Sequence, residues 1–120
     1  MSREHLVESY RNARRSLESN NEEESIFWLN KYSDYLPSDL SHEPKYWLVE
    51  QYLKVGKHDE AFETGESYLE GCKYPHAGNK AKEFAILFKS YDLLTHEVSL
   101  MRLSKKYTKL QEALRKKEYL

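Results

Sequence analysis

Apolar side chains recur at steps of three and four residues along most of this sequence, and this spacing limits its fold more than any other feature. Steps of that size place side chains on one face of an α-helix. Residues 3–19 carry such a stripe at Leu6, Tyr10, Ala13 and Leu17. No segment keeps the two-residue alternation of a half-buried strand between turn residues. The sequence therefore predicts an all-α fold.

Breaks between the apolar stripes divide the chain into about six helices in three antiparallel pairs. The pairs are expected to cover approximately residues 3–36, 44–71 and 79–117 of a single domain, residues 1–120. Their turns fall at Asn20, Gly56 and Thr95, so the first two turns are 36 residues apart and the next spacing is about 39. A period of this size is typical of helical repeats, in which stacked pairs bury apolar stripes that one pair leaves open.

Polar residues at the expected breaks supply start and stop signals. Ser41 and Asp59 are candidate N-caps for the third and fourth helices, and Pro37 disfavours helical geometry in the residue before it. The fifth helix is the most apolar, which predicts packing on two sides. Its stripe is expected at Ala81, Phe84, Ala85, Leu87, Phe88, Tyr91 and Leu94, and that of the sixth at Leu100, Leu103, Tyr107, Leu110 and Leu114.

Composition limits the class of protein. The longest apolar run, residues 85–88, is far too short to span a membrane. The first residues are charged rather than apolar, which argues against a cleaved secretion signal. Cys72 is the single cysteine, so an internal disulfide is excluded and a reducing compartment is favoured. We expect a cytoplasmic protein.

The net charge of -1 conceals a strong asymmetry. Residues 18–70 hold thirteen Asp or Glu against four Lys or Arg, and residues 101–120 hold seven Lys or Arg against two acids. Solvated faces are the simplest explanation. Head-to-tail self-association and an anionic partner at the basic end are the alternatives.

The stretch from Tyr46 to Tyr68 resembles the tetratricopeptide repeat family. Tyr52, Gly56 and Ala61 match that family in identity and spacing, as a late first-helix tyrosine, a turn glycine and a small packing residue. In the first pair Asn20 stands at the glycine position and Ser25 at the alanine position, whereas Leu100 stands at the alanine position of the third pair. The resemblance implies a right-handed superhelical array whose first helices line a concave groove.

Transferred by this resemblance, the groove implies binding of a peptide or partner protein, as in an adaptor or a regulatory subunit. Its lining would comprise Tyr10, Arg14, Leu17, Tyr46, Glu50, Leu53, Lys82 and Lys89, with Val7 and Ala85 beside them. Tyr10 and Trp47 replace two polar groups of the family's carboxylate clamp, so a clamp for an acidic C-terminus is not favoured. The alternative is that some of these aromatic residues belong to the core.

The last helix is a second candidate site. Its basic face comprises Lys105, Lys106, Lys109, Arg115, Lys116 and Lys117, which could bind phosphates of a nucleic acid or of a membrane surface. No nucleic-acid-binding motif accompanies these cations, so a solvated outer cap is the favoured explanation. The apolar stripe of the same helix leaves homodimerisation open.

Catalytic chemistry has little support. The four glycines are isolated, and the five histidines never fall at the i, i+4 spacing of a helical metal pair. Cys72 and His76 share a loop, but a nucleophile also needs an orienting group and an oxyanion site. Residues 22–24 are three glutamates that favour the start of a helix. We therefore predict no enzyme, no metal and no cofactor.

Overall fold

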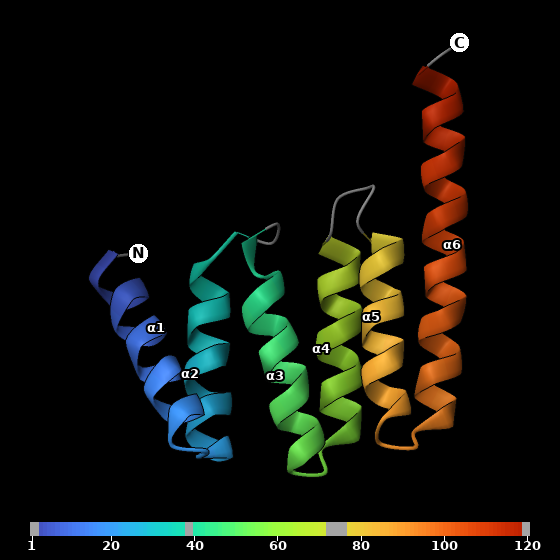
Figure 1. Ribbon diagram of the computed structural model, residues 1–120. Helices are drawn as coiled ribbons and strands as arrows, with labels where there is room; N and C mark the ends of the chain where they lie inside the picture. Colours follow the sequence, from blue (N-terminus) through green and yellow to red (C-terminus); the bar gives the residue numbers. More distant parts are fainter. Residues whose placement is uncertain (1–2, 38–39, 72–76, 119–120) are drawn as a thin grey trace. The chain divides into compact units, whose positions relative to one another are not determined.

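The computed structural model describes residues 3–37, 40–71 and 77–118. These ranges hold six α-helices and no strand, which confirms the all-α prediction (Figure 1). The Cys72–His76 segment, predicted as a loop with a possible thiolate, lies outside the described residues. The helices are α1 (Arg3–Glu18), α2 (Glu22–Tyr35), α3 (His42–Lys54), α4 (His58–Gly71), α5 (Ala77–Lys89) and α6 (Leu94–Glu118).

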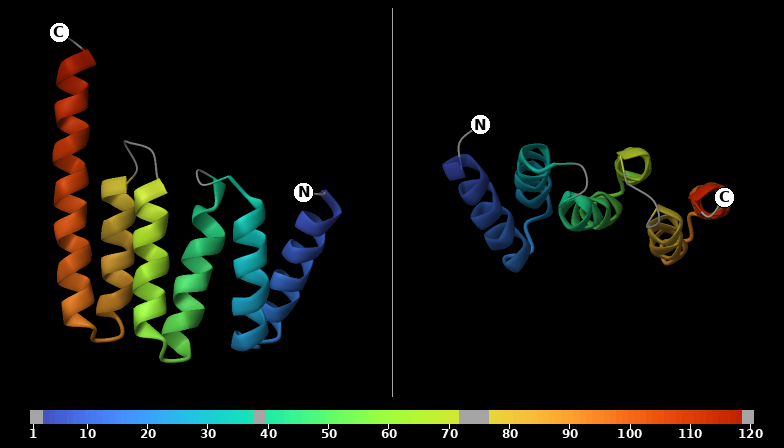
Figure 2. Two further views of the ribbon diagram at one scale, coloured as in Figure 1. Left: turned by 180° about the vertical axis from the view of Figure 1, so that it is seen from behind. Right: turned by 90° about the horizontal axis from the view of Figure 1, so that it is seen from above.

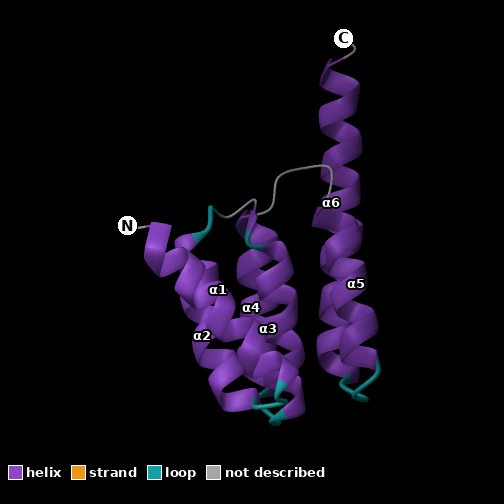
Figure 3. Ribbon diagram, turned by 60° about the vertical axis from the view of Figure 1, so that its left-hand side comes forward, coloured by secondary structure: helices purple, strands orange, loops and turns teal. Residues whose placement is uncertain are grey.

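The helices group into two compact units, Met1–Tyr68 and Leu69–Leu120, with the boundary near the end of α4. In the first unit α2 packs against both α1 and α3, and in the second α5 packs against α6. Figure 3 shows a short loop joining α5 to α6, and Figure 1 shows a short loop joining α1 to α2. Each unit is described by itself below.

Three turns share one backbone conformation. Asn20, Gly56 and Asp92 have φ values of 55°, 79° and 58°, in the left-handed region that only Gly, Asn and Asp adopt readily. Gly56 lies 36 residues after Asn20, and Asp92 lies 36 residues after Gly56. Asn20 thus turns the chain where the repeat resemblance expects glycine.

The third turn corrects the prediction that placed it at Thr95. Asp92 makes the turn, and the backbone N–H of Leu93 donates to the carbonyl of Phe88. Leu94, expected in the fifth helix, begins α6 instead and is exposed. A left-handed aspartate carries no distinctive sequence signal, because the same residue also fits an ordinary exposed helix position.

The predicted helix starts are close to those observed. The Asn21 side chain caps α2 by accepting a hydrogen bond from the backbone N–H of Glu24, at 3.2 Å. Ser41 is the N-cap residue of α3, as predicted, although its side chain makes no capping hydrogen bond. Asp59 was wrongly predicted as a cap, since α4 begins one residue earlier, at His58.

The buried face of α1 in the first unit, which we call its seam, consists of small residues. Ser9, Ala13 and Ser16 are its buried positions, whereas the predicted stripe residue Tyr10 is 42% exposed. The Ser9 and Ser16 hydroxyls donate to carbonyls four residues earlier, at 2.8 and 2.7 Å. A serine satisfied in this way packs as a small residue and allows close helix approach.

The core of the first unit centres on Ala13, Leu29 and Leu48 from three successive helices. Leu17, Ile26, Trp28, Trp47 and Tyr52 pack against this cluster and are partly buried. Trp47 therefore links the core to the surface of α3. The side-chain amide nitrogen of Asn30 donates to the hydroxyl of Tyr52 at 3.2 Å and so joins α2 to α3.

The core of the second unit lies between α5 and the first half of α6. Its α5 residues are buried at Ala77, Gly78, Ala81, Phe84, Ala85 and Phe88. Leu100 of α6 is also buried, as predicted, whereas Leu87 is only half-buried and Tyr91 is exposed. The Ser104 hydroxyl donates to the carbonyl of Gly78 at 2.8 Å, which fixes the two helices at close range.

The second half of α6 extends well beyond α5 (Figure 1), and the view from behind in Figure 2 shows the same extension. Leu110 and Leu114, expected on the packed stripe, are 40% and 45% exposed. The predicted stripe is therefore core only near Leu100. None of the helices in the described ranges has the length and apolar character needed to cross a bilayer.

Candidate partner-binding surface

Two tyrosines from neighbouring helices meet on the surface of the first unit. The rings of Tyr10 on α1 and Tyr32 on α2 lie 5.3 Å apart between centroids, tilted by 57°. This separation falls in the range of favourable aromatic pairs. Tyr10 was predicted to line a groove, whereas Tyr32 was not among the predicted groove residues.

An arginine and a tryptophan bring α3 to the same surface. The Arg14 guanidinium carbon lies 5.8 Å from the centre of the Trp47 ring, which is a cation–π contact between α1 and α3. Arg14 is exposed, and Trp47 is half-buried against the core. We call Tyr10, Arg14, Tyr32 and Trp47 the aromatic–arginine surface.

Titratable groups show which other residues border this surface. Burial raises the pKa of Tyr32, and the nearby Tyr10 and Glu43 raise it further. Glu43 on α3 therefore lies close to the tyrosine pair. The Tyr32 hydroxyl stays protonated at physiological pH and can both donate and accept hydrogen bonds.

Glu50 lies further along α3 and is half-buried. Burial raises the pKa of its carboxyl group, and Lys54 opposes this by lowering it. A carboxyl whose pKa is higher in the folded chain than in the unfolded chain favours folding when it is protonated. The folded state consequently loses stability as the pH rises through that pKa. A cationic group of a partner near Glu50 would offset this loss.

The remaining predicted groove residues are placed differently. Leu17 and Tyr46 are half-buried, and Leu17 packs on the core cluster. Leu53 is only 2% exposed and is a core residue, so it offers no surface for a partner. Lys82 and Lys89 are exposed on α5 in the second unit. One groove passing through both units therefore stays a prediction.

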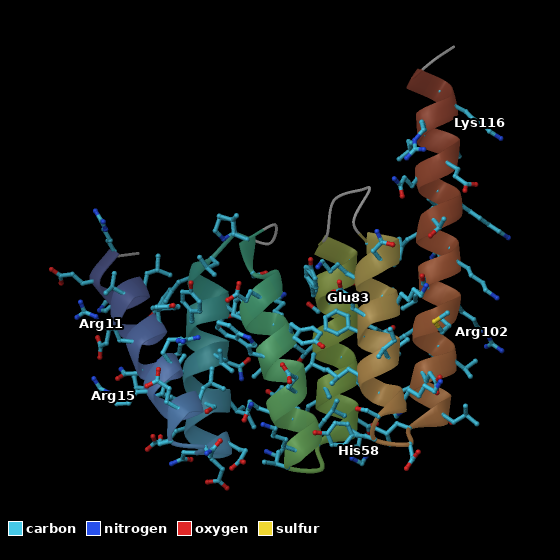
Figure 4. All side chains as sticks on the ribbon, in the orientation of Figure 1. Arg11, Arg15, His58, Glu83, Arg102 and Lys116 are labelled. Carbon is cyan, nitrogen blue, oxygen red and sulfur yellow. The ribbon has the colours of Figure 1, made fainter. Side chains whose placement is uncertain are left out.

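A second face of α1 carries a different set of residues. Val7, which was expected in the groove, lines a shallow depression together with Arg3, Arg11 and Arg15. Figure 4 shows Arg11 and Arg15 on the outer side of α1, away from α2. These arginines have the same charge as Arg14 and a different position, which makes them natural controls.

The first unit has a polar cleft that was not predicted from the sequence. Residues of α2, α3 and α4 line this open cleft, and its volume is about 300 Å³. Asp34, Glu60 and Glu63 supply exposed carboxylates, and Lys45 supplies a cation. The alignment of these residues depends on how three helices pack, and no local motif records that packing. We call this feature the acidic cleft.

The predicted basic face of the last helix is exposed at Lys105, Lys106, Lys109, Arg115, Lys116 and Lys117. Arg102 and Leu110 join Lys105, Lys106 and Lys109 around a shallow hollow. Leu110 is an apolar residue beside these cations, so the hollow is amphipathic. An anionic partner for this face remains a prediction.

No group of three or more His, Cys, Asp or Glu side chains within the described ranges is arranged to hold a metal ion. Comparisons with protein-family models, with curated proteins and with solved structures find no match for this chain. The function must therefore be inferred from the surfaces themselves.

Proposed function

We propose that this protein is a tetratricopeptide-like interaction module that binds a peptide or partner protein through the aromatic–arginine surface. The observation that carries the proposal is the convergence of two tyrosines, a tryptophan and an arginine from α1, α2 and α3. Trp, Tyr and Arg are the residue types most enriched among the side chains that dominate binding energy at protein interfaces.

The geometry of the four side chains supports binding. Tyr10 is 42% exposed although it contacts Tyr32, so part of its ring remains available to a partner. Trp47 is anchored in the core cluster and gives Arg14 a rigid support. Side chains that are already ordered lose less conformational entropy when a partner binds.

The chemistry of the surface indicates the kind of segment that it would accept. Apolar side chains of a partner would lie against Tyr10 and the exposed edge of Trp47. Arg14 would donate hydrogen bonds to a carboxylate or to backbone carbonyls of the bound segment. An extended or helical peptide with an apolar residue next to an acceptor meets these requirements.

The repeat assignment is supported by the regular positions of the three turns. Asn20, Gly56 and Asp92 are separated by the same interval, close to the repeat length of helical-pair arrays. Ala61 is fully buried and Ser25 almost so, at the positions where the family has a small residue. In this family the first helices of successive pairs face the ligand, and here Arg14 of α1 contacts Trp47 of α3.

Reversing the charge at Arg14 is expected to abolish partner capture. Arg14→Glu removes the cation from Trp47 and adds a carboxylate beside the tyrosine pair. We expect at least a tenfold loss of affinity, on the order of 1.4 kcal/mol or more. The measurement is affinity capture from a native lysate at physiological salt, followed by titration of the captured protein.

Arg15→Glu provides the matched control, because it makes the same charge change on the same helix at an exposed position on the outer face. Circular dichroism should show that both variants keep the helical content of the original chain. Capture that survives Arg14→Glu, or that is lost equally with Arg15→Glu, would contradict the proposal.

A further inference from the structure

A stripe of basic residues runs along α6 from the part beside α5 into the part that projects beyond it. Arg102, Lys105, Lys106, Lys109 and Lys116 lie at intervals that place them on one side of the helix, and Ala113 is the uncharged residue among them. Figure 4 shows Arg102 and Lys116 on the side of α6 away from α5. Glu112, three residues after Lys109 and four before Lys116, places a carboxylate at the edge of this basic stripe. Leu110 and Leu114 border it and are also exposed.

The acidic cleft of the first unit has the complementary character. Asp34, Glu60 and Glu63 come from two helices that flank α3, and their side chains are exposed around a concave surface. With Lys45 included, the lining of the cleft has a formal net charge of -2, and it belongs to a segment, residues 18–70, with a formal net charge of -9 from thirteen acids and four bases. Like charges on this scale repel one another, and a cationic helix would relieve that repulsion.

We propose that the basic stripe of α6 docks in the acidic cleft of a second copy of this chain. The two surfaces are opposite in charge and complementary in form, since a convex helix meets a concave cleft. They are also present in equal numbers in any solution of the protein. Each chain then offers one helix and one cleft, so association is heterologous and is able to continue beyond a dimer or close on itself.

Other occupants of the basic stripe fit less well. Pairing α6 with a second α6 along this stripe would place like charges against each other. An amphipathic helix that binds membranes needs a broad apolar face, whereas α6 offers two exposed leucines beside the stripe. A single-stranded nucleic acid is usually bound by stacking on aromatic rings, and the stripe contains none.

Salt is expected to weaken this association. Exposed charges are screened over about 10 Å at 0.1 M salt and over about 3 Å at 1 M. Raising the salt from about 0.05 M to about 0.5 M should therefore increase the dissociation constant on the order of tenfold. Sedimentation velocity of the full chain should show an average mass that rises with protein concentration at low salt and falls at high salt.

Charge exchange tests the pairing directly. Lys105→Glu/Lys109→Glu leaves three cations and two carboxylates on the stripe, so its formal charge falls from +5 to +1, and Glu60→Lys/Glu63→Lys reverses the charge of the cleft, all at exposed positions. Each variant alone is expected to sediment as a monomer. An equal mixture should regain association, because the unchanged stripe of the Glu60→Lys/Glu63→Lys variant meets the unchanged cleft of the Lys105→Glu/Lys109→Glu variant. Arg11→Glu/Arg15→Glu makes the same charge change on the outer side of α1 and should associate like the original chain.

Several results would overturn the proposal. A chain that stays monomeric at low salt and high concentration does not form the contact. A mixture of the two reversal variants that stays monomeric excludes this pairing of surfaces. A salt-dependent change in shape without a change in mass would place the contact within one chain. Binding to anionic vesicles or to an oligonucleotide without self-association would assign the stripe to that ligand instead. Arg14 is unchanged in every variant, so these outcomes are separate from the function proposed above.

Discussion

Replacing Phe88 with alanine is expected to destabilise the α5–α6 unit by about 3–5 kcal/mol. Phe88 is fully buried, and its ring stacks on His96 of α6 with 5.5 Å between centroids. The substitution removes this contact and leaves a cavity that rigid helices fill only in part. Hydrogen exchange of α5 and α6 amides should accelerate by several orders of magnitude, because opening of the unit becomes much less costly.

Ile86 provides the control for Phe88, since it lies two residues away on the same helix and is 61% exposed. Ile86→Ala should change the stability by no more than about 0.5 kcal/mol, as surface substitutions usually do. Equal exchange rates in the two variants would mean that Phe88 does not hold α5 against α6.

Substituting Gly78 with alanine is expected to cost about 1–3 kcal/mol, the usual penalty for overpacking. A Cβ atom at this position would lie 2.7 Å from the Thr108 hydroxyl oxygen and 3.3 Å from the Ser104 carbonyl oxygen. The Thr108 hydroxyl donates to that same carbonyl at 2.9 Å, so it cannot move away without losing the hydrogen bond. Better helix propensity returns no more than about 1 kcal/mol. Denaturant unfolding measures the difference.

Removing the obstructing atom should rescue the Gly78 variant. Thr108→Ala deletes the hydroxyl, and Thr108 is itself exposed, so alone it should have little effect. The Gly78→Ala/Thr108→Ala double variant is expected to recover most of the lost stability. Additive losses in this double-mutant cycle would show that the close contact between α5 and α6 is not the cause.

Helix periodicity predicted the fold class and most helix ends from the sequence. Phe84, Phe88 and Leu100 are all buried, as the apolar spacing indicates. The local rule for Pro37 was also sufficient for the end of α2, where Leu36 is the C-cap residue. These features could be predicted because they depend on residues that are close together in the sequence.

The seam of α1 could not be predicted in the same way, because it consists of small residues rather than apolar ones. A search for apolar stripes selects Tyr10 and passes over Ser9 and Ser16, although the serines are buried. The turn at Asp92 was missed for a related reason. The positive φ of this one residue ends the turn before Thr95, so α6 starts earlier than predicted. In both cases the sequence pattern fits two alternatives equally well, namely two faces of α1 or two positions of the turn. Tertiary packing decides between them.

The candidate surface was predicted in part. Tyr10, Arg14 and Glu50 were expected to line a groove, and the first two contact Tyr32 and Trp47 respectively. The partners of these residues are fixed by the angles between α1, α2 and α3, which a single sequence does not specify. The acidic cleft depends on the same packing and was not predicted at all.

The most direct test of the proposed function asks whether a partner touches the aromatic–arginine surface. A photoreactive benzophenone amino acid would replace Tyr10 in one chain and Phe27 in another. Phe27 is 52% exposed, has Lys31 above its ring at 5.0 Å, and lies on a different face of α2 from Tyr32. We predict a crosslinked protein from position 10 that Arg14→Glu removes, and none from position 27. A crosslink from position 27 alone would contradict the assignment of the binding surface.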